Sequence, residues 1–336
     1  MPKIIITDTT LRDGSHSVKH NFTLEEIKKI CKSLDDAGID IIEVGHGDGL
    51  TGSTVNYGFS KYNDFEMLEA SKSVIKNAKL ATLLLPGIGT VKDLKKAKDV
   101  GVEVVRIATH VTEADISQQH IIEAKKMGYF VVGFLMMAHR ASAERILFEA
   151  KKMESYGADV VYVTDSAGAM VSNEVEEKIS LLVKNLNIPI GFHSHNNLGL
   201  AIGNSLAALK SGATYIDGSL GGLGAGAGNT ATEMLIAVLN KTGYTHNTDL
   251  FKTMDASSYI LNPILKEHGV NLPLLLDSMM LGYSGVYSSF MLHARRAAKR
   301  FNVDYRDIIL ELGKREAVGG QEDWIVEIAK ELSNND

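Results

Sequence analysis

The chain has 336 residues, of which 45% are hydrophobic, so it can bury a large core and is not a disordered protein. Its net charge is -6 and its lysines and arginines are scattered, which argues against nucleic acid as a partner. Its single cysteine, Cys31, excludes a disulfide framework and a thiolate metal cluster, and it fits a reducing compartment.

The chain enters a predicted strand almost at once, without a signal peptide, and no apolar run reaches the length of a membrane span. The sequence therefore predicts a cytoplasmic protein. The first 240 residues then repeat one pattern, in which a helical stretch and a glycine turn lead to a short strand rich in β-branched residues. The predicted strands are Ile4–Asp8, Ile39–Gly45, Leu80–Leu85, Val104–Thr109, Phe130–Met136, Val160–Asp165, Ile190–His195 and Tyr215–Ser219.

Strands that alternate with helices at this spacing indicate a parallel sheet. Eight such units in succession favour a closed (β/α)8 TIM barrel over an open doubly wound sheet, which usually has fewer strands. Amphipathic helices lie between the strands, and the first, Leu24–Leu34, is preceded by Thr23 and contains Glu26 in a capping-box arrangement. We expect residues 1–245 to form this catalytic barrel.

Residues 246–336 depart from the repeat and predict a helical C-terminal region. No flexible linker separates the two parts, so we expect this region to pack at the barrel mouth. The predicted helices are Leu250–His268, Leu272–Met280, Tyr287–Phe301, Tyr305–Lys314 and Asp323–Leu332, with turns at Gly282, Gly285 and Gly319-Gly320.

Two short motifs carry candidate metal ligands. Asp13 follows the first strand, and His193 and His195 end the seventh. Side chains two residues apart on a strand point the same way, and the carboxyl ends of barrel strands share one face. Two imidazoles and one carboxylate would hold a divalent ion and leave positions open for substrate. Paired polar residues at a barrel rim are the alternative for the two histidines.

The ion we expect is Mn²⁺ or Mg²⁺, and a 2-oxo acid would chelate it through its keto and carboxylate oxygens. Arg12 could add positive charge at the developing oxyanion, or it could form a structural salt bridge to Asp165 or Glu43. His16 is the natural proton carrier because its ordinary pKa lies near neutrality. None of the predicted strand ends carries a lysine, so a metal-enolate route is favoured over an imine route.

A glycine-rich run at 221–228 follows the eighth strand. Such a run could cradle a phosphate, but we favour a tight loop, because Thr230 and Glu233 have capping-box spacing and no acidic residue follows at the Rossmann spacing.

Several motifs resemble those of the metal-dependent TIM-barrel lyases that include isopropylmalate synthase and 3-hydroxy-3-methylglutaryl-CoA lyase. They are TLRDG at 10–14, HSHNN at 193–197 and the segment from Gly212 through GNTATE at 228–233. More narrowly, four further motifs resemble the 4-hydroxy-2-oxovalerate aldolase family: GSH at 14–16, HGDGL at 46–50, LLLPGIGT at 83–90 and LGYSGVYSS at 281–289.

This resemblance implies class II retro-aldol cleavage of 4-hydroxy-2-oxopentanoate to pyruvate and acetaldehyde through a metal-stabilised pyruvate enolate, in aromatic or steroid catabolism. Asp13, His193 and His195 would hold Mn²⁺, with His193 also near substrate. Arg12 would steady the enolate, and His16 would take the C4-hydroxyl proton.

The resemblance also implies roles for further residues and for a partner. Tyr283 would touch the proton path or the aldehyde end, and Tyr287 of the same motif is the alternative. Leu83–Leu85 would border the aldehyde pocket, and Leu85 would contact the substrate there. Ser166, in the DSAG run at 165–168, would support the substrate site. An acylating acetaldehyde dehydrogenase would form a hetero-oligomer with the helical region around residues 319–323 and receive the aldehyde by channelling.

Three rival functions remain at this stage. An acyl-CoA condensing enzyme shares the expected fold, but the GSH motif and the absence of a large C-terminal regulatory domain argue against it. Two histidines and a carboxylate also bind non-haem iron in oxygenases. A catalytically silent barrel that only binds a partner would not need an intact set of ligands.

Overall fold

The computed structural model describes residues 2–271, 276–286, 290–315, 317 and 321–334. The chain divides into two compact units, residues 1–273 and 274–336. The first contains the barrel, and the second consists of helices.

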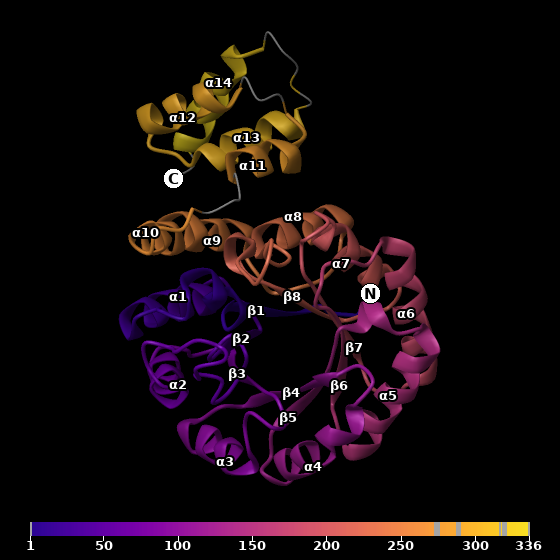
Figure 1. The fold of residues 1–336 in the computed structure, drawn as a ribbon. Helices are drawn as coiled ribbons and strands as arrows, with labels where there is room; N and C mark the ends of the chain where they lie inside the picture. The colour runs from indigo at the N-terminus through magenta and orange to yellow at the C-terminus, as the bar shows by residue number, and fades with distance from the viewer. Residues whose placement is uncertain (1, 272–275, 287–289, 316, 318–320, 335–336) are drawn as a thin grey trace. The chain divides into compact units, whose positions relative to one another are not determined.

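The strands of the first unit form a closed parallel barrel in which each strand pairs with its neighbour in sequence and β8 closes onto β1 (Figure 1). The strands are β1 (Ile5–Leu11), β2 (Ile41–Val44), β3 (Lys79–Leu84), β4 (Val104–His110), β5 (Phe130–Met136), β6 (Val160–Asp165), β7 (Ile190–Ser194) and β8 (Tyr215–Gly218). The TIM-barrel prediction is confirmed, and β1 continues three residues beyond the predicted end at Asp8. Arg12 is therefore the first residue after β1 and lies at the carboxyl end of the barrel.

Helices surround the barrel on its outside (Figure 1). They are α1 (Leu24–Asp36), α2 (Asp64–Lys72), α3 (Val91–Val100), α4 (Gln118–Lys126), α5 (Ala143–Tyr156), α6 (Ser172–Asn185), α7 (Ala201–Lys210) and α8 (Thr232–Thr242). Short helical turns add η1 (Asp13–Val18), η2 (Ala114–Ser117), η3 (Ala138–Arg140) and η4 (Leu220–Gly222). The predicted capping box at the start of α1 is present, with Glu26 N–H donating to the Thr23 hydroxyl and Thr23 N–H to the Glu26 carboxylate.

The helix predicted over residues 250–268 is a continuous helical segment with a π-helical middle: α9 (Leu250–Asp255), η5 (Ala256–Leu261) and α10 (Asn262–Glu267). It packs against α1 and α8 and belongs to the first unit, although the sequence suggested a boundary at residue 245.

The second unit contains α11 (Leu276–Ser284), α12 (Phe290–Phe301), α13 (Tyr305–Lys314) and α14 (Asp323–Ser333) in its described part, and these helices pack against one another. Gly282 lies inside α11, so the predicted turn there is wrong; Gly285, with φ +75°, does end that helix. The predicted glycine pair at 319-320 lies outside the described residues. None of the described helices combines the length and hydrophobicity that a membrane span requires.

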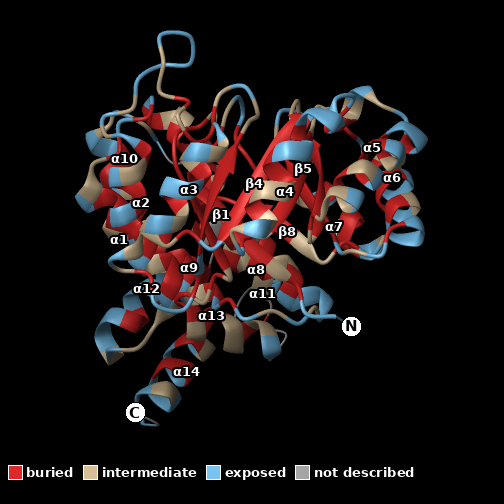
Figure 2. Cartoon of the chain, turned by 90° about the horizontal axis from the view of Figure 1, so that it is seen from below, coloured by how far each residue is buried: buried red, intermediate tan, exposed pale blue. Residues whose placement is uncertain are grey.

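The barrel interior is closely packed, and the strands are the most buried part of the molecule (Figure 2). Its core cluster consists of Ile41, Ala81, Leu83, Val104, Ala108, Val132, Phe134, Val160 and Tyr162.

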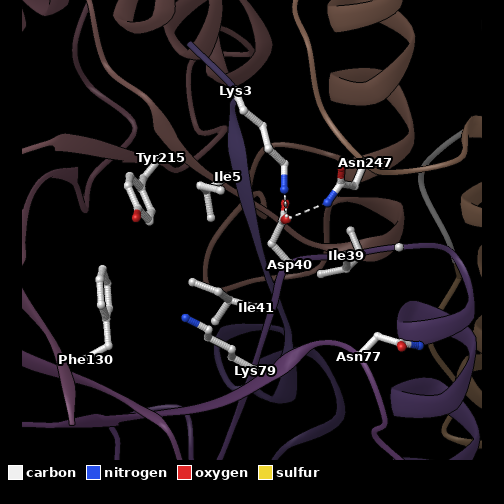
Figure 3. Close-up of a pocket in the computed structure, with 11 residues that line it drawn as sticks. Lys3, Ile5, Ile39, Asp40, Ile41, Asn77, Lys79, Phe130, Tyr215 and Asn247 are labelled. Atoms are coloured by element: carbon white, nitrogen blue, oxygen red, sulfur yellow. Dashed lines mark hydrogen bonds and ion pairs between the residues drawn. The ribbon is translucent and has the colours of Figure 1, made fainter. Parts of the chain in front are cut away.

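At the amino-terminal end of the strands, a pocket of about 330 Å³ opens below this core (Figure 3). Lys3 and Asn247 both donate to the Asp40 carboxylate there, and the rings of Phe130 and Tyr215 stack with centroids 6.2 Å apart.

Candidate metal centre

The candidate ligands come from two strands that lie apart in the sequence and end at the same face of the barrel. Asp13 begins η1 directly after β1, His193 lies within β7, and His195 follows that strand. His195 is held by a bridge to Asn229 and by a contact of 3.4 Å from its Nδ1 to the Ala225 carbonyl. The parity expected for a strand is preserved, because both imidazoles face the same carboxylate.

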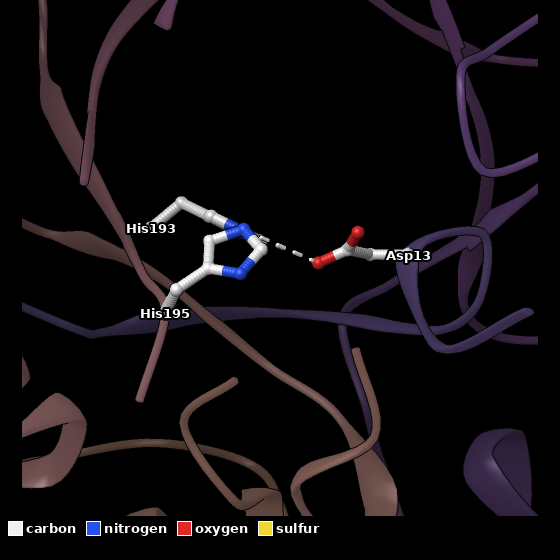
Figure 4. Close-up of side chains that lie close together, drawn as sticks. All are labelled: Asp13, His193 and His195. Carbon is white, nitrogen blue, oxygen red and sulfur yellow. Dashed lines mark ion pairs between the residues drawn. The ribbon is translucent and has the colours of Figure 1, made fainter. Parts of the chain in front are cut away.

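The three side chains converge on one point (Figure 4). Asp13 Oδ2 lies 3.7 Å from His193 Nε2 and 3.5 Å from His195 Nε2. Ligand atoms that share one ion at about 2.0–2.2 Å are separated by roughly 3–4 Å. All three residues are at least 91% buried, and a buried carboxylate between two imidazoles is a donor set that suits a divalent cation. The cluster can therefore hold a divalent metal ion.

Asp13 is kept ionised by its neighbours. Burial raises the pKa of its carboxyl group, but the Arg12 charge and the contact with His193 outweigh burial and hold the pKa well below its ordinary value. The Asn229 amide also donates to Asp13 Oδ2 at 2.6 Å. Asn229 was not assigned a role from the sequence, although it lies in the GNTATE motif, and its buried Oδ1 has no protein partner.

The ring of His193 is oriented from behind by a second carboxylate. Its Nδ1 lies 2.7 Å from Asp217 Oδ2, which leaves Nε2 directed at Asp13. Burial favours the neutral ring, but the carboxylates of Asp13 and Asp217 together raise the pKa of His193. Burial lowers the pKa of His195, so that imidazole is neutral near pH 7 and able to act as a ligand.

Asp217 belongs to a buried chain of charges that returns to Asp13. Arg106 donates to Asp217 at 2.5 Å and to Glu43 at 3.0 Å, and its guanidinium lies over the rings of Phe134 and Tyr162. Glu43 also accepts from Arg12, 2.8 Å away, and Arg12 lies 3.2 Å from Asp13. We call the residues His193, Asp217, Arg106, Glu43, Arg12 and Asp13 the charge network.

Sequence reasoning named Glu43 only as a possible partner and missed Arg106 and Asp217 altogether. The available signal was a charged residue in the middle of a short apolar strand, as in VVRIA at 104–108 and YIDG at 215–218. Such a residue is buried on folding and must find a partner of opposite charge.

Arg12 was expected to be either an ion-pair partner or a catalytic group. The ion pair is with Glu43, not with Asp165, whose carboxylate instead accepts the backbone N–H groups of Ala169 and Met170. The pair occupies Nε and leaves the buried Nη2 of Arg12 without a hydrogen-bond partner among the described residues. The Glu43 and Asp13 charges raise the pKa of Arg12 against the effect of burial, so the guanidinium remains charged. The ion pair therefore orients a cation that keeps a free donor.

His16 lies on η1 beside this donor set. Its Nε2 is 3.8 Å from Asp13 Oδ1, and its side chain is 27% exposed. Burial is the main cause that lowers its pKa, so the ring is neutral at pH 7 and can accept a proton. The structure thus brings His16, Arg12 and the three candidate ligands together.

The contacts of the remaining predicted site residues are as follows. The Ser166 hydroxyl accepts the N–H of Met137 and so joins the loops after β5 and β6. Leu85 packs partly buried against the barrel core. Tyr283 lies on α11 of the second unit, and Tyr287 lies outside the described residues. Their roles stay predictions.

The glycine-rich run is a tight loop. A Cβ on Gly228, whose φ is +89°, would lie 2.0 Å from the carbonyl oxygen of Gly222. The capping box predicted for Thr230 and Glu233 is wrong, because α8 starts one residue later than expected, with Ala231 at its N-cap. Both carboxylate oxygens of Glu233 instead accept the Gly221 N–H, which ties α8 to the loop.

Two family models match the chain in sequence. The HMGL-like model matches residues 3–260, and the model of the DmpG-like communication domain matches residues 275–334. A 4-hydroxy-2-oxovalerate aldolase from Pelotomaculum thermopropionicum is 58% identical over 100% of this chain and 98% of its own length. One from Geobacillus thermodenitrificans is 57% identical, covering 98% of this chain and 96% of the relative.

Solved structures agree on the fold. The HMG-CoA lyase from Bacillus subtilis superposes with a TM-score of 0.69 at 21% identity, covering 82% of this chain and 97% of the lyase. The HMG-CoA lyase from Brucella melitensis superposes with a TM-score of 0.66 at 15% identity, covering 79% of this chain and 100% of the lyase.

Proposed function

The chain belongs to the HMGL-like family and, within it, to the 4-hydroxy-2-oxovalerate aldolases, and we propose that it cleaves 4-hydroxy-2-oxopentanoate to pyruvate and acetaldehyde. The observation that carries this proposal is the buried cluster of Asp13, His193 and His195, with a free guanidinium nitrogen of Arg12 beside it. An oxygenase or a condensing enzyme could share the ligands, but neither is the activity named for relatives this similar along their whole length.

Asp13, His193 and His195 would hold the ion, for which we propose Mn²⁺, with Mg²⁺ or another divalent ion as an alternative. When bound, the ion supplies Lewis-acid stabilisation of the negative charge that develops on the keto oxygen of the substrate. His193 would also lie near the substrate, because a substrate that shares the ion is held next to the residues that ligate it.

Arg12 would steady the same developing charge with its unpartnered Nη2. Its Nε is fixed by Glu43, so the free donor is already oriented before substrate arrives. A preorganised charged donor in a buried site costs no reorganisation during the reaction. Arg12 is thereby assigned to formation of the enolate.

His16 would take the proton from the C4 hydroxyl. As that proton leaves, the C3–C4 bond breaks, its electron pair forms the enolate of pyruvate, and C4 becomes the carbonyl carbon of acetaldehyde. The enolate is then protonated at C3 to give pyruvate. The lowered pKa of His16 supports this role, because a general base must be unprotonated at the working pH.

The outer parts of the substrate would be contacted by residues from three regions. Leu85 would border the methyl end of the aldehyde, Ser166 would support the loops beneath the substrate, and Tyr283 would act on the proton path as a catalytic and substrate-binding residue. For Tyr283 the support is the sequence motif on α11 alone.

We also propose an acylating acetaldehyde dehydrogenase as partner in a hetero-oligomer. The support is the match of residues 275–334 to the DmpG-like communication domain. The barrel would carry catalysis and the helical region the partner contact at the barrel mouth. The expected cytoplasmic location and the catabolic pathway stay predictions.

The test is pyruvate release from 4-hydroxy-2-oxopentanoate by protein stripped with a chelator and then supplied with Mn²⁺. Release that depends on added metal supports the proposal. Oxygen uptake with a 2-oxo acid, or acyl-CoA consumption without pyruvate release, would replace it with one of the rival functions.

Exchange of the C3 protons of pyruvate separates the two catalytic assignments. Substitution Arg12→Gln should remove exchange and cleavage together, because both require the enolate. Substitution His16→Ala should retain exchange and lower the cleavage rate about 10²–10⁴-fold, the usual contribution of a general base. Equal loss of exchange in both variants would show that the assignment of roles is wrong.

A further inference from the structure

His16 also belongs to a second group of possible metal ligands, together with His20 and Asp48. Atoms of His16, His20 and Asp48 that can act as ligands all lie within 4.8 Å of one another. This group, which we call the histidine cluster, is formed by η1, the turn that follows it and the loop after β2. It contains none of the three residues of the first candidate centre.

The ligand atoms of the histidine cluster have few partners in the described structure: His16 Nε2 lies 3.8 Å from Asp13 Oδ1, and Asp48 Oδ2 lies 3.6 Å from His46 Nδ1. No hydrogen bond there engages the imidazole nitrogens of His16 or the carboxylate of Asp48. His20 Nδ1 bonds the Ser15 hydroxyl at 2.9 Å and also accepts the Gly47 N–H at 3.4 Å, whereas its Nε2 makes no hydrogen bond to the described residues. A buried histidine without a full set of partners leaves ligand capacity that a cation can satisfy.

The backbone and one further ring hold the cluster in place. Lys19 and His20 both have positive φ, 53° and 58°, a conformation that costs energy in residues other than glycine. The His46 ring stacks on His20, with centroids 3.9 Å apart, while its own nitrogens are engaged by the Gly58 carbonyl and the Asp48 N–H. His46 is therefore a support and not a ligand.

We propose that His16, His20 and Asp48 form a second metal site, which takes a borderline-soft divalent ion such as Zn²⁺. Two imidazoles and one carboxylate are a donor set that zinc favours, with a fourth position left to water. Ligand atoms around one zinc ion lie roughly 3–4 Å apart, so closure from the observed spacing needs side-chain shifts of about 1 Å.

Occupation of this site has a functional consequence that rests on the proposed function. A zinc ion held by His16 takes the lone pair that would receive the C4-hydroxyl proton. Arg12 and the first metal centre remain intact, so the enolate can still form. Zinc should therefore inhibit carbon–carbon cleavage while leaving C3 proton exchange of pyruvate in place.

Binding is measured first, without turnover. Protein loaded with Mn²⁺ is dialysed against Zn²⁺, and both metals are counted per chain. We expect one zinc ion to bind in addition to the retained manganese. Release of one Mn²⁺ for each Zn²⁺ bound would overturn the proposal, because it would place zinc in the first centre. This arm stands even if the enzyme acts on another substrate.

Variants locate the second ion. Substitutions His20→Gln and Asp48→Asn should each weaken zinc binding at least about 10-fold, as loss of one of three ligands does. The matched control is His110→Gln, which changes an exposed histidine at the carboxyl end of β4 and should leave zinc binding unchanged. The Asp48 side chain is 29% exposed, so Asp48→Asn gives a folded test if His20→Gln does not fold. Unchanged zinc affinity in Asp48→Asn would contradict the proposal.

The kinetic arm compares two rates in the same Mn²⁺-loaded protein. Zinc at a concentration that fills the second site should lower pyruvate release at least about 10-fold and leave C3 exchange within about twofold. In Asp48→Asn, the same zinc concentration should no longer inhibit cleavage. Parallel loss of exchange and cleavage would show that zinc acts at the first centre instead.

Discussion

The two ends of the barrel interior differ in how they accommodate charged side chains. At the carboxyl end, the charge network runs through residues that are almost fully buried, and several of its polar atoms have no protein partner. At the amino end, Figure 3 shows a pocket lined by isoleucine, aromatic and polar side chains, in which Lys3 pairs with Asp40 and the lysine side chain is 39% exposed.

This difference indicates that the carboxyl end is built to bind a ligand, whereas the amino end has no comparable network among the described residues. Buried charges are expensive unless they are paired, so a network that also retains unpaired donors and acceptors is maintained for a ligand. Among the described residues, Nη2 of Arg12 in the network and Oδ1 of Asn229, whose amide bonds Asp13, have no hydrogen-bond partner. None of the described residues that line the amino-terminal pocket has such a buried unpaired atom, which agrees with the general placement of active sites at the carboxyl end of TIM barrels.

The strongest way to break the network is to remove its central cation. Substitution Arg106→Met leaves Glu43 with Arg12 alone and Asp217 with His193 alone, so two buried carboxylates lose a cation and the fold should be destabilised by about 3–5 kcal/mol. Because Asp217 orients His193 and Glu43 orients Arg12, the value of kcat/KM should also fall at least about 100-fold. Chemical denaturation and steady-state kinetics measure the two effects.

The control for Arg106→Met removes a cation at the opposite end. Substitution Lys79→Met changes a side chain that contacts the Phe130 ring at 5.5 Å beside the amino-terminal pocket. It should leave kcat/KM within about twofold, since the cation–π contact contributes at most about 1 kcal/mol at an exposed site. Similar kinetic losses in the two variants would mean that the two ends are not functionally distinct.

A second variant acts on metal binding without removing a ligand. Substitution Asp217→Asn should weaken Mn²⁺ affinity about 10–100-fold, because the carboxylate fixes the orientation of His193. Calorimetric titration with Mn²⁺ measures this loss. Asp40→Asn is the matched control at the amino end and should bind Mn²⁺ like the unchanged protein. If both variants bind equally well, the second carboxylate has no part in the metal centre.

The contrast also shows what could be predicted from sequence. Strand ends and the spacing of His193 and His195 follow from local periodicity, so the barrel and the candidate ligands could be predicted. The partners of Arg106 could not, because Glu43 and Asp217 lie 63 and 111 residues away and meet it only when the barrel closes. The capping box assigned to Glu233 failed for a more local reason, since α8 begins one residue later than expected and the Gly221 N–H of the preceding loop binds the carboxylate.

Glu233 provides a test by pH at the carboxyl end. Burial raises the pKa of this carboxyl group from 4.5 to about 8, so the folded chain holds a proton that the unfolded chain releases above its ordinary pKa. Stability from this group is complete below about pH 4.5 and is lost as pH rises through about 8. Burial also raises the pKa of nearby Asp8 to about 6, which adds a step in the same direction at lower pH.

Substitution Glu233→Gln should remove most of this dependence. We expect the melting temperature of the variant to match that of the unchanged protein near pH 5.5 and to exceed it by several degrees at pH 9, because the amide does not ionise. Melting curves between pH 5 and 9 measure the difference, with exposed Glu144→Gln as the control. Parallel curves for the two proteins across this range would show that Glu233 is ionised in the folded state.

The smallest effect is expected from the ion pair at the amino end. Substitution Lys3→Met removes a contact of 2.8 Å to Asp40 from a lysine whose side chain is 39% exposed. Exposed pairs contribute about 0–1 kcal/mol, and Asp40 keeps its bonds from the Ile6 N–H and the Asn247 amide, so the fold should lose less than about 1 kcal/mol. Manganese affinity and kcat/KM should stay within about twofold, because no hydrogen bond links this pair to the charge network in the described residues. A larger loss of Mn²⁺ affinity would reveal coupling along the barrel axis and remove the division between the two ends.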